Sequence, residues 1–472
     1  MRFLTVISVF LISCMTSVAA TYYVSSSTGS DYNSGTSESS PRKTLSGLYS
    51  RMKNGNTILL KRGDVFFESL TGFTDCTISD YGSGAKPVIC GFIIQKDNSS
   101  WTQSSSGVWT LDLNNASAFY GHACNAKVNT YGNIGCLYDP ETDTIVGNLV
   151  KSSSDLKNEG DFHTSSTWLK ADVSSSTFSK LYLKSAARPK AYCLASGEIA
   201  VSEMRNCSIS NIAVVGFGCH GMNYLYDCTV TDCDLDIIGG SIMVGQNSSW
   251  ARYGNGIELW ISASPCNGNK IIGCQITRVY DVAVSIQGNA VGGANPSGNH
   301  ITSNRIAWCR QGFEQWTTTD GASVVFEDCC FSKNVLYCCG DNKFTGTESR
   351  TTDVTFLCYK YPAADMPIED NLVYAHNYRY SQYNEGGFAD NEVYVVAGKC
   401  LYYYYRPDAP SFTLVADTPA QTSLYRKYSG DNSRIVIVQP NSAEDQSAAS
   451  RVYGMLNYSS IAPSWNTLNQ YR

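Results

Sequence analysis

The sequence has little charge, and it has no long apolar stretch beyond its first twenty residues. Only 16% of the residues are Asp, Glu, Lys or Arg, and acidic residues outnumber basic ones by 41 to 35. A nucleic-acid-binding protein would carry a clustered basic face, which this balance argues against. No later segment approaches the roughly 20 apolar residues that a membrane-spanning helix needs. We therefore expect no nucleic-acid partner and no transmembrane segment.

Several familiar catalytic motifs are also missing from the sequence. It contains no phosphate-binding loop, no serine nucleophile elbow and no dinucleotide-binding fingerprint. No group of His, Cys and carboxylate residues has the sequence spacing of a zinc site. We therefore expect no metal and no cofactor, although a lyase mechanism would call for Ca²⁺. The sequence does not indicate the oligomeric state.

The first twenty residues have the pattern of an export signal, in which Arg2 precedes an apolar run over residues 3–12. Two processing sites compete. The small residues at 18–20 predict cleavage before Thr21, whereas residues 11–14 resemble a bacterial lipobox and would place a lipid on Cys14. We favour the first site, because sequence typical of a folded domain begins directly after it, at Tyr22. Either site predicts a secreted, periplasmic or cell-surface protein, lipid-anchored in the second case.

A four-residue pattern recurs from about residue 205: a small or polar residue, then Cys or Asn, then any residue, then an apolar one. Its second positions are Cys207, Cys228, Cys274, Asn304, Cys329, Asn371 and Asn391. Self-similarity at intervals of 20 to 46 residues indicates a solenoid. Apolar residues alternate around each match with period 2, which predicts strands.

We expect the Cys and Asn residues of this pattern to form one column along the solenoid, or to lie within a rung position of it. Neighbouring rungs would place them about 4.8 Å apart, so that Asn amides bond along the column and Cys thiols are buried. These cysteines are therefore predicted to be inward and unpaired, although export would ordinarily favour disulfides. Disulfides remain open for Cys329 with Cys330 and for Cys338 with Cys339, whose spacing differs.

The start of the mature chain has a strand, a turn rich in Gly, Ser and Asn, a short capping helix and a first rung from Asn56 to Phe67. A second segment, ISDYGSGAKPVICG, follows at residues 78–91. Together with the rungs, these segments resemble the pectate-lyase-like superfamily of right-handed parallel β-helix proteins, roughly over residues 21–95 and 190–400. The resemblance implies an all-β fold and a carbohydrate-active protein. It does not fix the chemistry, because the superfamily includes lyases, hydrolases, epimerases and non-enzymes.

The rung pattern divides the chain into five parts. We expect a signal peptide at 1–20, an N-terminal cap with the first rungs at 21–96, and a β-rich insertion at 97–190. The insertion breaks the pattern and carries Trp101, Trp109 and Trp168. Further rungs follow at 191–400, and residues 401–472, which show no rung pattern, are expected to cap the open edge.

Three segments around residues 253–260, 280–287 and 312–316 align on a small residue. The alignment predicts three columns: Gly256, Ala283 and Gly312; Glu258, Ser285 and Glu314; and Trp260, Gln287 and Trp316. Strand alternation then directs Ile257, Val284 and Phe313 inward, and the second and third columns outward. The sequence therefore predicts an outward face that carries two glutamates and two tryptophans.

Glu258 and Glu314 are the predicted catalytic residues, with Asp281 as a third carboxylate at the edge of the face. Two rungs separate the bases of the glutamates by about 9–10 Å. Flexible side chains would bring the carboxyl groups within the roughly 6.5–9.5 Å of inverting glycosidases. Trp260 and Trp316 would stack on the apolar side of a sugar ring. Alternatively, the glutamates are only solvated, the tryptophans pack under a loop, and Asp281 caps a turn.

The remaining candidates are expected to bind substrate. They are Gln287, His220, Tyr253, Asn255, Arg252 and Arg310. His220 aligns one rung before the Tyr253 segment, where it would be a general base, a hydroxyl contact or a structural residue. Arg252, Arg278 and Arg310 would neutralise a uronate carboxylate or pair with Glu258, Asp281 and Glu314.

Three functions follow from these residues. The favoured one is a glycoside hydrolase that acts on a poly- or oligosaccharide with paired carboxylates. The second is a polysaccharide lyase or epimerase, which would abstract a proton beside a uronate carboxylate neutralised by Arg or Ca²⁺. The third is a non-catalytic carbohydrate-binding or adhesin β-helix. The sequence does not identify the sugar, the linkage, or endo versus exo cleavage.

Overall fold

The computed structural model describes most of the chain. The described residues are 19–120, 134–164, 180–242, 252–289, 294–317, 324–341, 343–346, 353–359, 362–364, 366–382, 387–405 and 410–457. The expected signal peptide, with Cys14, falls almost entirely outside them, and so does Trp168. Within these ranges, no helix combines the length and the apolar character needed to cross a membrane.

Three sheets of ten strands each form the body of the molecule, and neighbouring strands run parallel except for the last pair of the third sheet. Sheet A contains β1 (Thr21–Val24), β2 (Thr57–Lys61), β5 (Thr77–Tyr81), β18 (Ser208–Ser210), β21 (Thr229–Thr231), β26 (Lys270–Ile272), β29 (His300–Thr302), β33 (Cys330–Ser332), β38 (Ile368–Glu369) and β41 (Phe388–Ala389). Sheet B contains β3 (Val65–Phe66), β6 (Val88–Cys90), β19 (Ala213–Val215), β22 (Asp234–Ile238), β27 (Gln275–Val279), β30 (Arg305–Ala307), β34 (Val335–Tyr337), β39 (Leu372–Ala375), β42 (Glu392–Val396) and β45 (Arg434–Val438). Sheet C contains β4 (Leu70–Thr71), β17 (Val201–Arg205), β20 (Met222–Tyr226), β25 (Ile257–Ile261), β28 (Val282–Gly288), β31 (Gln311–Thr317), β36 (Val354–Tyr359), β40 (Arg379–Gln382), β43 (Cys400–Tyr405) and β44 (Phe412–Val415).

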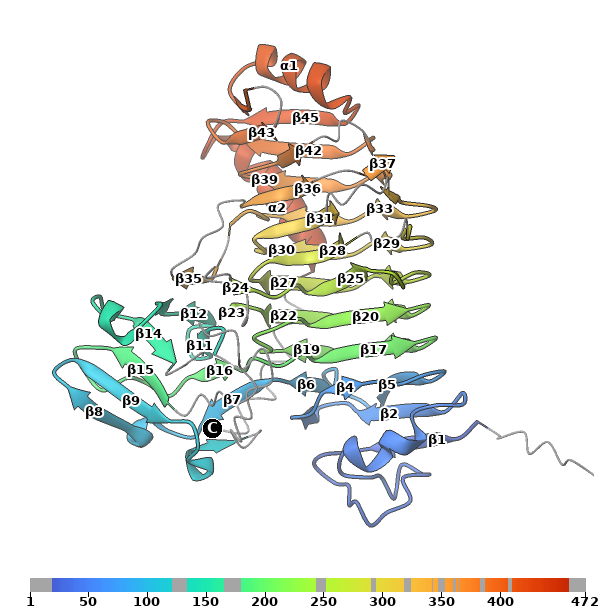
Figure 1. Ribbon diagram of the computed structural model, residues 1–472, viewed down its shortest axis with the longest axis vertical. Helices are drawn as coiled ribbons and strands as arrows, with labels where there is room; N and C mark the ends of the chain where they lie inside the picture. Colours follow the sequence, from blue (N-terminus) through green and yellow to red (C-terminus); the bar gives the residue numbers. More distant parts are fainter. Residues whose placement is uncertain are drawn as a thin grey trace, which may run out of the picture.

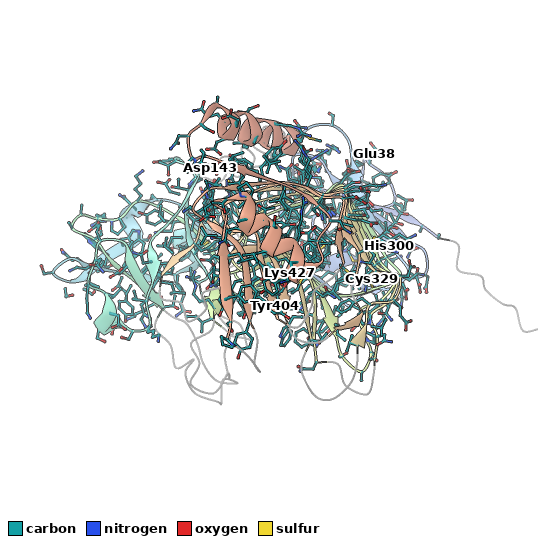
Figure 2. All side chains as sticks on the ribbon, turned by 90° about the horizontal axis from the view of Figure 1, so that it is seen from above. Glu38, Asp143, His300, Cys329, Tyr404 and Lys427 are labelled. Carbon is teal, nitrogen blue, oxygen red and sulfur yellow. The ribbon has the colours of Figure 1, made fainter. Side chains whose placement is uncertain are left out.

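The chain visits the three sheets in turn, as in β18, β19 and β20, and each circuit pairs in register with the next. This is a parallel β-helix, as the sequence predicts, and its stacked rungs are seen from the side in Figure 1 and along the axis in Figure 2. Alternate residues point inward, so that Ile209, Val214 and Leu225 are fully buried in one continuous core. Burial of these aliphatic columns is the main favourable contribution to stability.

The corners before sheets A and B explain the Cys and Asn pattern. Asp227, Asp232 and Ser303 have φ angles of 53°, 50° and 60°, a left-handed conformation that Asp, Asn and Gly tolerate best. The Cys or Asn that follows each of them is buried and leads into a strand. The repeating unit is therefore a corner in which one left-handed residue turns the chain.

The expectation of a single Cys and Asn column is wrong, because each rung has two such corners. Cys207, Cys228 and Cys329 precede strands of sheet A. The other four predicted members, Cys274, Asn304, Asn371 and Asn391, precede strands of sheet B. The sequence pattern is the same at both corners because both make the same local demand on the backbone.

The side chains in these columns behave as predicted. In the sheet B column, Asn304 Nδ2 donates to Asn334 Oδ1 at 3.0 Å, and Asn371 Nδ2 donates to Asn391 Oδ1 at 2.8 Å. The described cysteines form no disulfides, and this includes Cys329, Cys330, Cys338 and Cys339. The disulfide alternative for those two neighbouring pairs is therefore wrong.

Two further sheets lie beside the helix, formed by strands of residues 97–190 together with three strands from outside that range (Figure 1). One contains β10 (Phe119–Tyr120), β7 (Phe92–Gln95), β16 (Cys193–Ala195), β11 (Leu137–Asp139) and β12 (Thr144–Val146). The other contains β35 (Thr345–Gly346), β13 (Asn148–Leu149), β14 (Asp161–Thr164), β15 (Lys180–Lys184), β9 (Val108–Asp112) and β8 (Trp101–Ser105). Trp101 and Trp109 are buried in a separate core, and their indole N–H groups donate to the carbonyls of Lys190 and Ser185.

The chain ends differ in part from the expectation. Residues 401–472 were expected to lack rungs, which is wrong, because β43 pairs in parallel with β40 and β45 with β42. Helix α1 (Pro419–Ser429) lies at the end of the stack in Figure 1. Helix α2 (Ala443–Leu456) starts at Ser442, whose hydroxyl accepts from the backbone N–H of Asp445, and buries Val452 and Leu456 against the outer face of sheet B. At the other end, η1 (Ser46–Arg51) buries Leu48 over the first rungs.

Candidate functional site

The register of sheet C confirms the predicted glutamate and tryptophan columns, and it pairs the three residues that were predicted to point inward. The paired residues are Ile257, Val284 and Phe313; Glu258, Ser285 and Glu314; and Trp260, Gln287 and Trp316. The first set lies in the core with no exposed surface, so the other two point away from it. Glu258 and Glu314 therefore stand on one outer face, with Ser285 between them.

Glu258 points away from the core but is not solvated. It is only 6% exposed, and its Oε2 accepts hydrogen bonds from Asn255 Nδ2 at 3.2 Å and from Gln287 Nε2 at 2.7 Å. Its Oε1 lies 3.8 Å from His220 Nε2. Two amides hold one oxygen of this carboxylate, and the other oxygen faces the imidazole.

The backbone fixes which nitrogen of His220 carries the proton. The N–H of Asn255 donates to His220 Nδ1 at 3.1 Å, so Nδ1 is an acceptor and the neutral ring carries its hydrogen on Nε2. Tyr253 packs edge-on against the ring at 5.3 Å, and its hydroxyl is 2.9 Å from Cys219 Sγ. In this arrangement His220 presents a donor toward Glu258, which favours a hydrogen-bonding role over that of a general base.

Asn255 ties neighbouring rungs together around Glu258. Its Nδ2 also lies 3.1 Å from Ser285 Oγ, and its Oδ1 accepts from the backbone N–H of Val282 at 3.4 Å. With a residue exposure of 1%, Asn255 is a buried scaffold for the glutamate. Tyr253, at 2% exposure, supports the His220 ring from behind in the same way.

The polar column extends further than the sequence reasoning found. Asn223 pairs with Glu258 on the preceding rung, and Ser202 Oγ donates to Asn223 Oδ1 at 2.6 Å. Extending the alignment of His220 with Asn255 by three residues would have identified Asn223. The signal was present, but neither residue type is distinctive in a chain rich in Ser and Asn.

Aromatic side chains lie along the same face. The rings of Trp260 and Trp316 are both half-buried and approach to 6.3 Å at an interplanar angle of 45°, although their strands are separated by β28. Farther along, the glutamate column continues through Leu357 to Tyr380 and Tyr403, whose rings stack at 4.9 Å. This tyrosine pair was not predicted. The face combines carboxylates with flat apolar surfaces.

The other two carboxylate candidates differ in their surroundings. Glu314 is half-buried on β31. Asp281 is 5% exposed and lies at the corner before β28, where its N–H donates to Gly254 O and its carbonyl accepts from Gln311 N. Asp281 is therefore part of the corner and lies outside the glutamate column, which favours the turn role over catalysis.

The candidate arginines have buried structural partners. Arg252 donates to the carbonyls of Gly240, Thr345 and Gly135 and lies 4.3 Å from the centre of the Tyr280 ring. Through Thr345 and Gly135 it connects the helix with the loop after β34 and with the inserted region. These contacts favour a structural role over binding substrate.

Arg278 and Arg310 pair with carboxylates. Arg278 forms ion pairs with Asp236 and Asp143, and Arg310 Nε lies 2.6 Å from Asp353. These partners are not the ones expected from the sequence, which were Glu258, Asp281 and Glu314.

Comparisons with known proteins gave only distant structural similarities. No model of a known family and no curated protein sequence matches the chain. It is similar to a solved complex of XylC with xylose, with a TM-score of 0.42, 12% identity, and coverage of 88% of this chain and 82% of the other. It is also similar to a GH136 lacto-N-biosidase from Eubacterium ramulus (TM-score 0.33, 13% identity, coverage 89% and 67%) and to a rhamnogalacturonan lyase (TM-score 0.30, 12% identity, coverage 80% and 74%). These values describe resemblance only.

Proposed function

We propose that this protein is an exported glycoside hydrolase that cleaves a poly- or oligosaccharide on the outer face of sheet C. The observation that carries the proposal is the column of Glu258, Ser285 and Glu314 beside the tryptophan pair. Glycosidases need two carboxyl groups on either side of the scissile bond and a surface that accepts the apolar side of a sugar ring. Export is proposed from the pattern of the first twenty residues.

Glu258 is the proposed general base. Two amide donors on Oε2 suit a carboxylate, which only accepts hydrogen bonds when ionised, and they leave Oε1 to orient a water molecule together with the His220 Nε2–H. Glu314, which is more exposed, is the proposed general acid that protonates the departing sugar oxygen. Its side chain is accessible to a substrate lying over the rungs.

The spacing of the two glutamates favours inversion at the anomeric carbon. They are two strands apart, which separates their bases by about 9–10 Å. A retaining enzyme needs its carboxyl groups roughly 5–5.5 Å apart, whereas an inverting one leaves roughly 6.5–9.5 Å for the attacking water. The intervening residue, Ser285, carries no carboxyl group, so this column has no acidic pair on adjacent strands that would suit the shorter retaining separation.

The contacts of His220 and the arginines give less support to a lyase. Proton abstraction needs a free base, but His220 Nδ1 accepts from the backbone and Nε2 carries the hydrogen of the neutral ring. Neutralising a uronate needs an available cation, but Arg252 binds three carbonyls, and Arg278 and Arg310 lie against aspartates. No metal or cofactor is invoked for the hydrolase.

The test is to incubate the protein with neutral and uronate-containing glycans, and to measure new reducing ends and the absorbance of unsaturated products. The hydrolase proposal expects reducing ends without unsaturation. Glu258→Gln and Glu314→Gln should each lower kcat by about 10²-fold or more, since general acid–base catalysis contributes 10²–10⁴. Proton NMR of the first product anomer should show inversion.

Glu369→Gln is the matched control, because Glu369 is a half-buried strand glutamate on sheet A. It should leave activity unchanged. Trp260→Ala or Trp316→Ala should mainly raise KM, because the indoles are proposed to bind the sugar ring and not the reacting bond. Full activity in folded Glu258→Gln and Glu314→Gln variants would refute the assignment, and unsaturated products would establish a lyase instead.

A further inference from the structure

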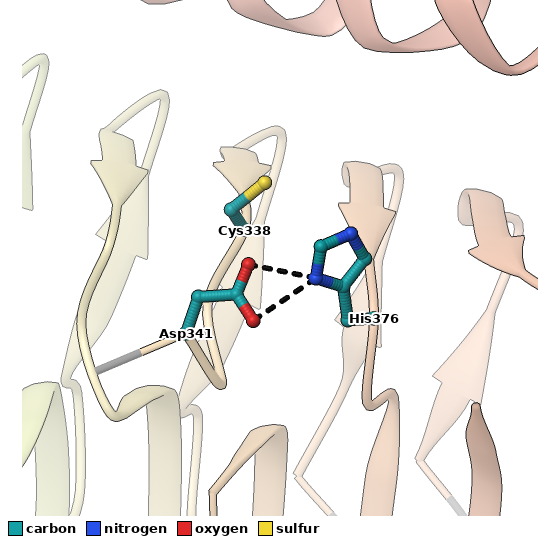
Figure 3. A group of neighbouring side chains, drawn as sticks. All are labelled: Cys338, Asp341 and His376. Carbon is teal, nitrogen blue, oxygen red and sulfur yellow. Dashed lines mark hydrogen bonds and ion pairs between the residues drawn. The ribbon is translucent and has the colours of Figure 1, made fainter. Parts of the chain in front are cut away.

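Three side chains with metal-binding atoms meet at the corner between sheets B and C, within the described part of the chain. They are the thiol of Cys338, the carboxylate of Asp341 and the imidazole of His376, whose ligand atoms all lie within 4.8 Å of one another (Figure 3). Cys338 and Asp341 follow β34, and His376 follows β39 on the next rung. Rung stacking brings them together, although 35 residues separate Asp341 from His376 in the sequence.

The geometry of this cluster is close to that of a bound metal. His376 Nδ1 lies 2.8 Å from Asp341 Oδ2 and 3.0 Å from Oδ1. Zinc bound tetrahedrally, with Zn–S near 2.3 Å and Zn–N or Zn–O near 2.0 Å, would place its ligand atoms roughly 3.3–3.6 Å apart. Small side-chain shifts would therefore suffice. The side chains of Asp341 and His376 are 31% and 32% exposed, which gives an ion access from solvent.

Cys338 is placed differently from the cysteines of the ladder. Its neighbour Cys339 belongs to the inner core, but Cys338 belongs to the outer cluster between sheet B and helix α2. The His376 ring is oriented by an edge-on contact with Tyr374, at 6.1 Å, and Tyr374 stacks on Tyr337 at 5.4 Å. The thiol and the imidazole are therefore both held by surrounding packing.

We propose that Cys338, Asp341 and His376 form a binding site for a divalent metal ion of borderline softness, Zn²⁺ in the first instance. One thiolate, one imidazole and one carboxylate are a donor set that zinc accepts, and the hard ions Ca²⁺ and Mg²⁺ prefer oxygen ligands alone. Three protein ligands leave a fourth position for water. The sequence indicated no such site because the ligands come from two successive rungs.

The ion would join the base of one loop to the adjacent rung. The loop after β34 carries Cys338 and Asp341, and it continues to β35, which pairs with β13 of the inserted sheets. Thr345 in that loop also accepts from Arg252. A metal bound at the start of the loop would fix the segment that connects the helix with the insertion. The site shares no residue with the glutamate column and is independent of the proposed hydrolase activity.

The experiment is a titration of the reduced, metal-free full chain with Zn²⁺ by calorimetry, and with Co²⁺ by absorption. We expect one Zn²⁺ per chain and a thiolate-to-Co²⁺ charge-transfer band. Cys338→Ser should abolish the band, and Asp341→Asn and His376→Gln should each weaken Zn²⁺ binding at least 10-fold. Zn²⁺ at 100 times its Kd should raise the thermal midpoint of the wild-type protein by about 3 °C, and that of His376→Gln by much less.

Two controls separate this site from adventitious binding by other groups. His300 and Asp328 form a comparable ion pair at 3.2 Å on sheet A, and Cys330 is a half-buried thiol on the same sheet. His300→Gln and Cys330→Ser should leave the Zn²⁺ affinity and the thiolate-to-Co²⁺ charge-transfer band unchanged. The proposal fails if the wild-type protein binds no ion, or if His376→Gln and Asp341→Asn bind like the wild type. Those two half-exposed positions keep the test decisive even if Cys338→Ser does not fold.

Discussion

The side-chain amide of Gln287 donates a hydrogen bond of 2.7 Å to Oε2 of Glu258 on the neighbouring strand. In the register of sheet C, Gln287 pairs with Trp260 and not with Glu258, so the amide reaches diagonally across the rung. Asn255 supplies a second donor to the same oxygen. Together they restrict the rotation of the carboxylate and leave Oε1 toward His220, as a positioned base requires.

Removing the Gln287 amide tests this positioning role. We expect Gln287→Ala to lower kcat by about 10-fold with KM changed less than about 2-fold, because misplacement of a catalytic group costs rate more than binding. Steady-state kinetics on the substrate found in the glycan screen measures both constants. Gln103→Ala, at an exposed position of the insertion, is the control and should change neither. A rise in KM with unchanged kcat would mean that Gln287 contacts the sugar instead.

The burial of Glu258 leads to a second prediction, on stability. Truncation of Glu258 to Ala would leave the amides of Asn255 and Gln287 without this acceptor. We expect Glu258→Ala to lower the free energy of unfolding by about 1–3 kcal/mol. Glu258→Gln, which keeps an acceptor oxygen, and Glu314→Ala, at a half-buried position, should each cost less than about 1 kcal/mol. Urea unfolding measures the free energy of unfolding of the three variants. Equal losses in all three would contradict the proposed role of Glu258 as the acceptor for these amides.

The fold and the site columns were predictable because a β-helix repeats one local rule. Period-2 alternation fixes which residues face inward, and aligning Gly256, Ala283 and Gly312 was enough to place both glutamates and both tryptophans. The same rule explains the error over the Cys and Asn column. The corners before sheets A and B both need a left-handed residue followed by a small buried one, so the pattern cannot distinguish them.

Contacts made by the insertion were not predictable from the repeat. Arg252 binds the carbonyls of Gly135 and Thr345, and Arg278 pairs with Asp143, so their partners lie outside the rungs. The cluster of Cys338, Asp341 and His376 depends on which rungs are adjacent across a long loop. Such contacts are set by tertiary structure, and no local period encodes them.

The asparagine ladder allows a third prediction. Asn334 is fully buried, its Oδ1 accepts from both the backbone N–H and Nδ2 of Asn304, and its Nδ2 donates to Ile301 O and Asn371 Oδ1. Asn334→Ala leaves several buried polar groups unpaired, and we expect a loss of about 3 kcal/mol. Asn114→Ala, on an exposed turn of the insertion, is the control and should cost less than about 0.5 kcal/mol. A cost below 1 kcal/mol at Asn334 in urea unfolding would show that the ladder contributes little.

The free cysteines give a fourth prediction. Denaturing the protein without reductant and titrating with a thiol reagent should find nearly all cysteines of the mature chain reactive, since those in the described residues form no disulfides. In the folded protein only Cys330 and Cys400 are even half-exposed among them, so peptide mapping should find these two labelled first. Loss of early labelling in Cys330→Ser and Cys400→Ser would confirm the sites. A thiol count near zero would imply disulfides and contradict the structure.

Buried thiols also predict how stability depends on alkaline pH. Burial raises the pKa of Cys266 to about 12 and that of Cys329 and Cys400 to about 11, from an ordinary value of 9.0. Well below pH 9 the thiols are protonated in both states and contribute no pH dependence. Between about pH 9 and 11 the unfolded chain loses these protons while the folded protein keeps them, so the unfolded state binds fewer protons. The free energy of unfolding must then fall as pH rises.

The fall should be steep because several thiols act in the same direction, each by up to about 1.4 kcal/mol per pH unit. Urea unfolding in the presence of reductant at pH 8, 9, 10 and 10.5 measures this fall in the free energy of unfolding. The measurement does not depend on the proposed hydrolase activity. Cys400→Ser removes one such thiol from a half-exposed position and should make the slope shallower than in the wild type. Burial also raises the pKa of the Cys330 thiol, so Cys330→Ser should likewise make the slope shallower. A free energy of unfolding that stays level or rises over this range would show that thiol ionisation does not control alkaline stability, and that other groups titrating there compensate for it.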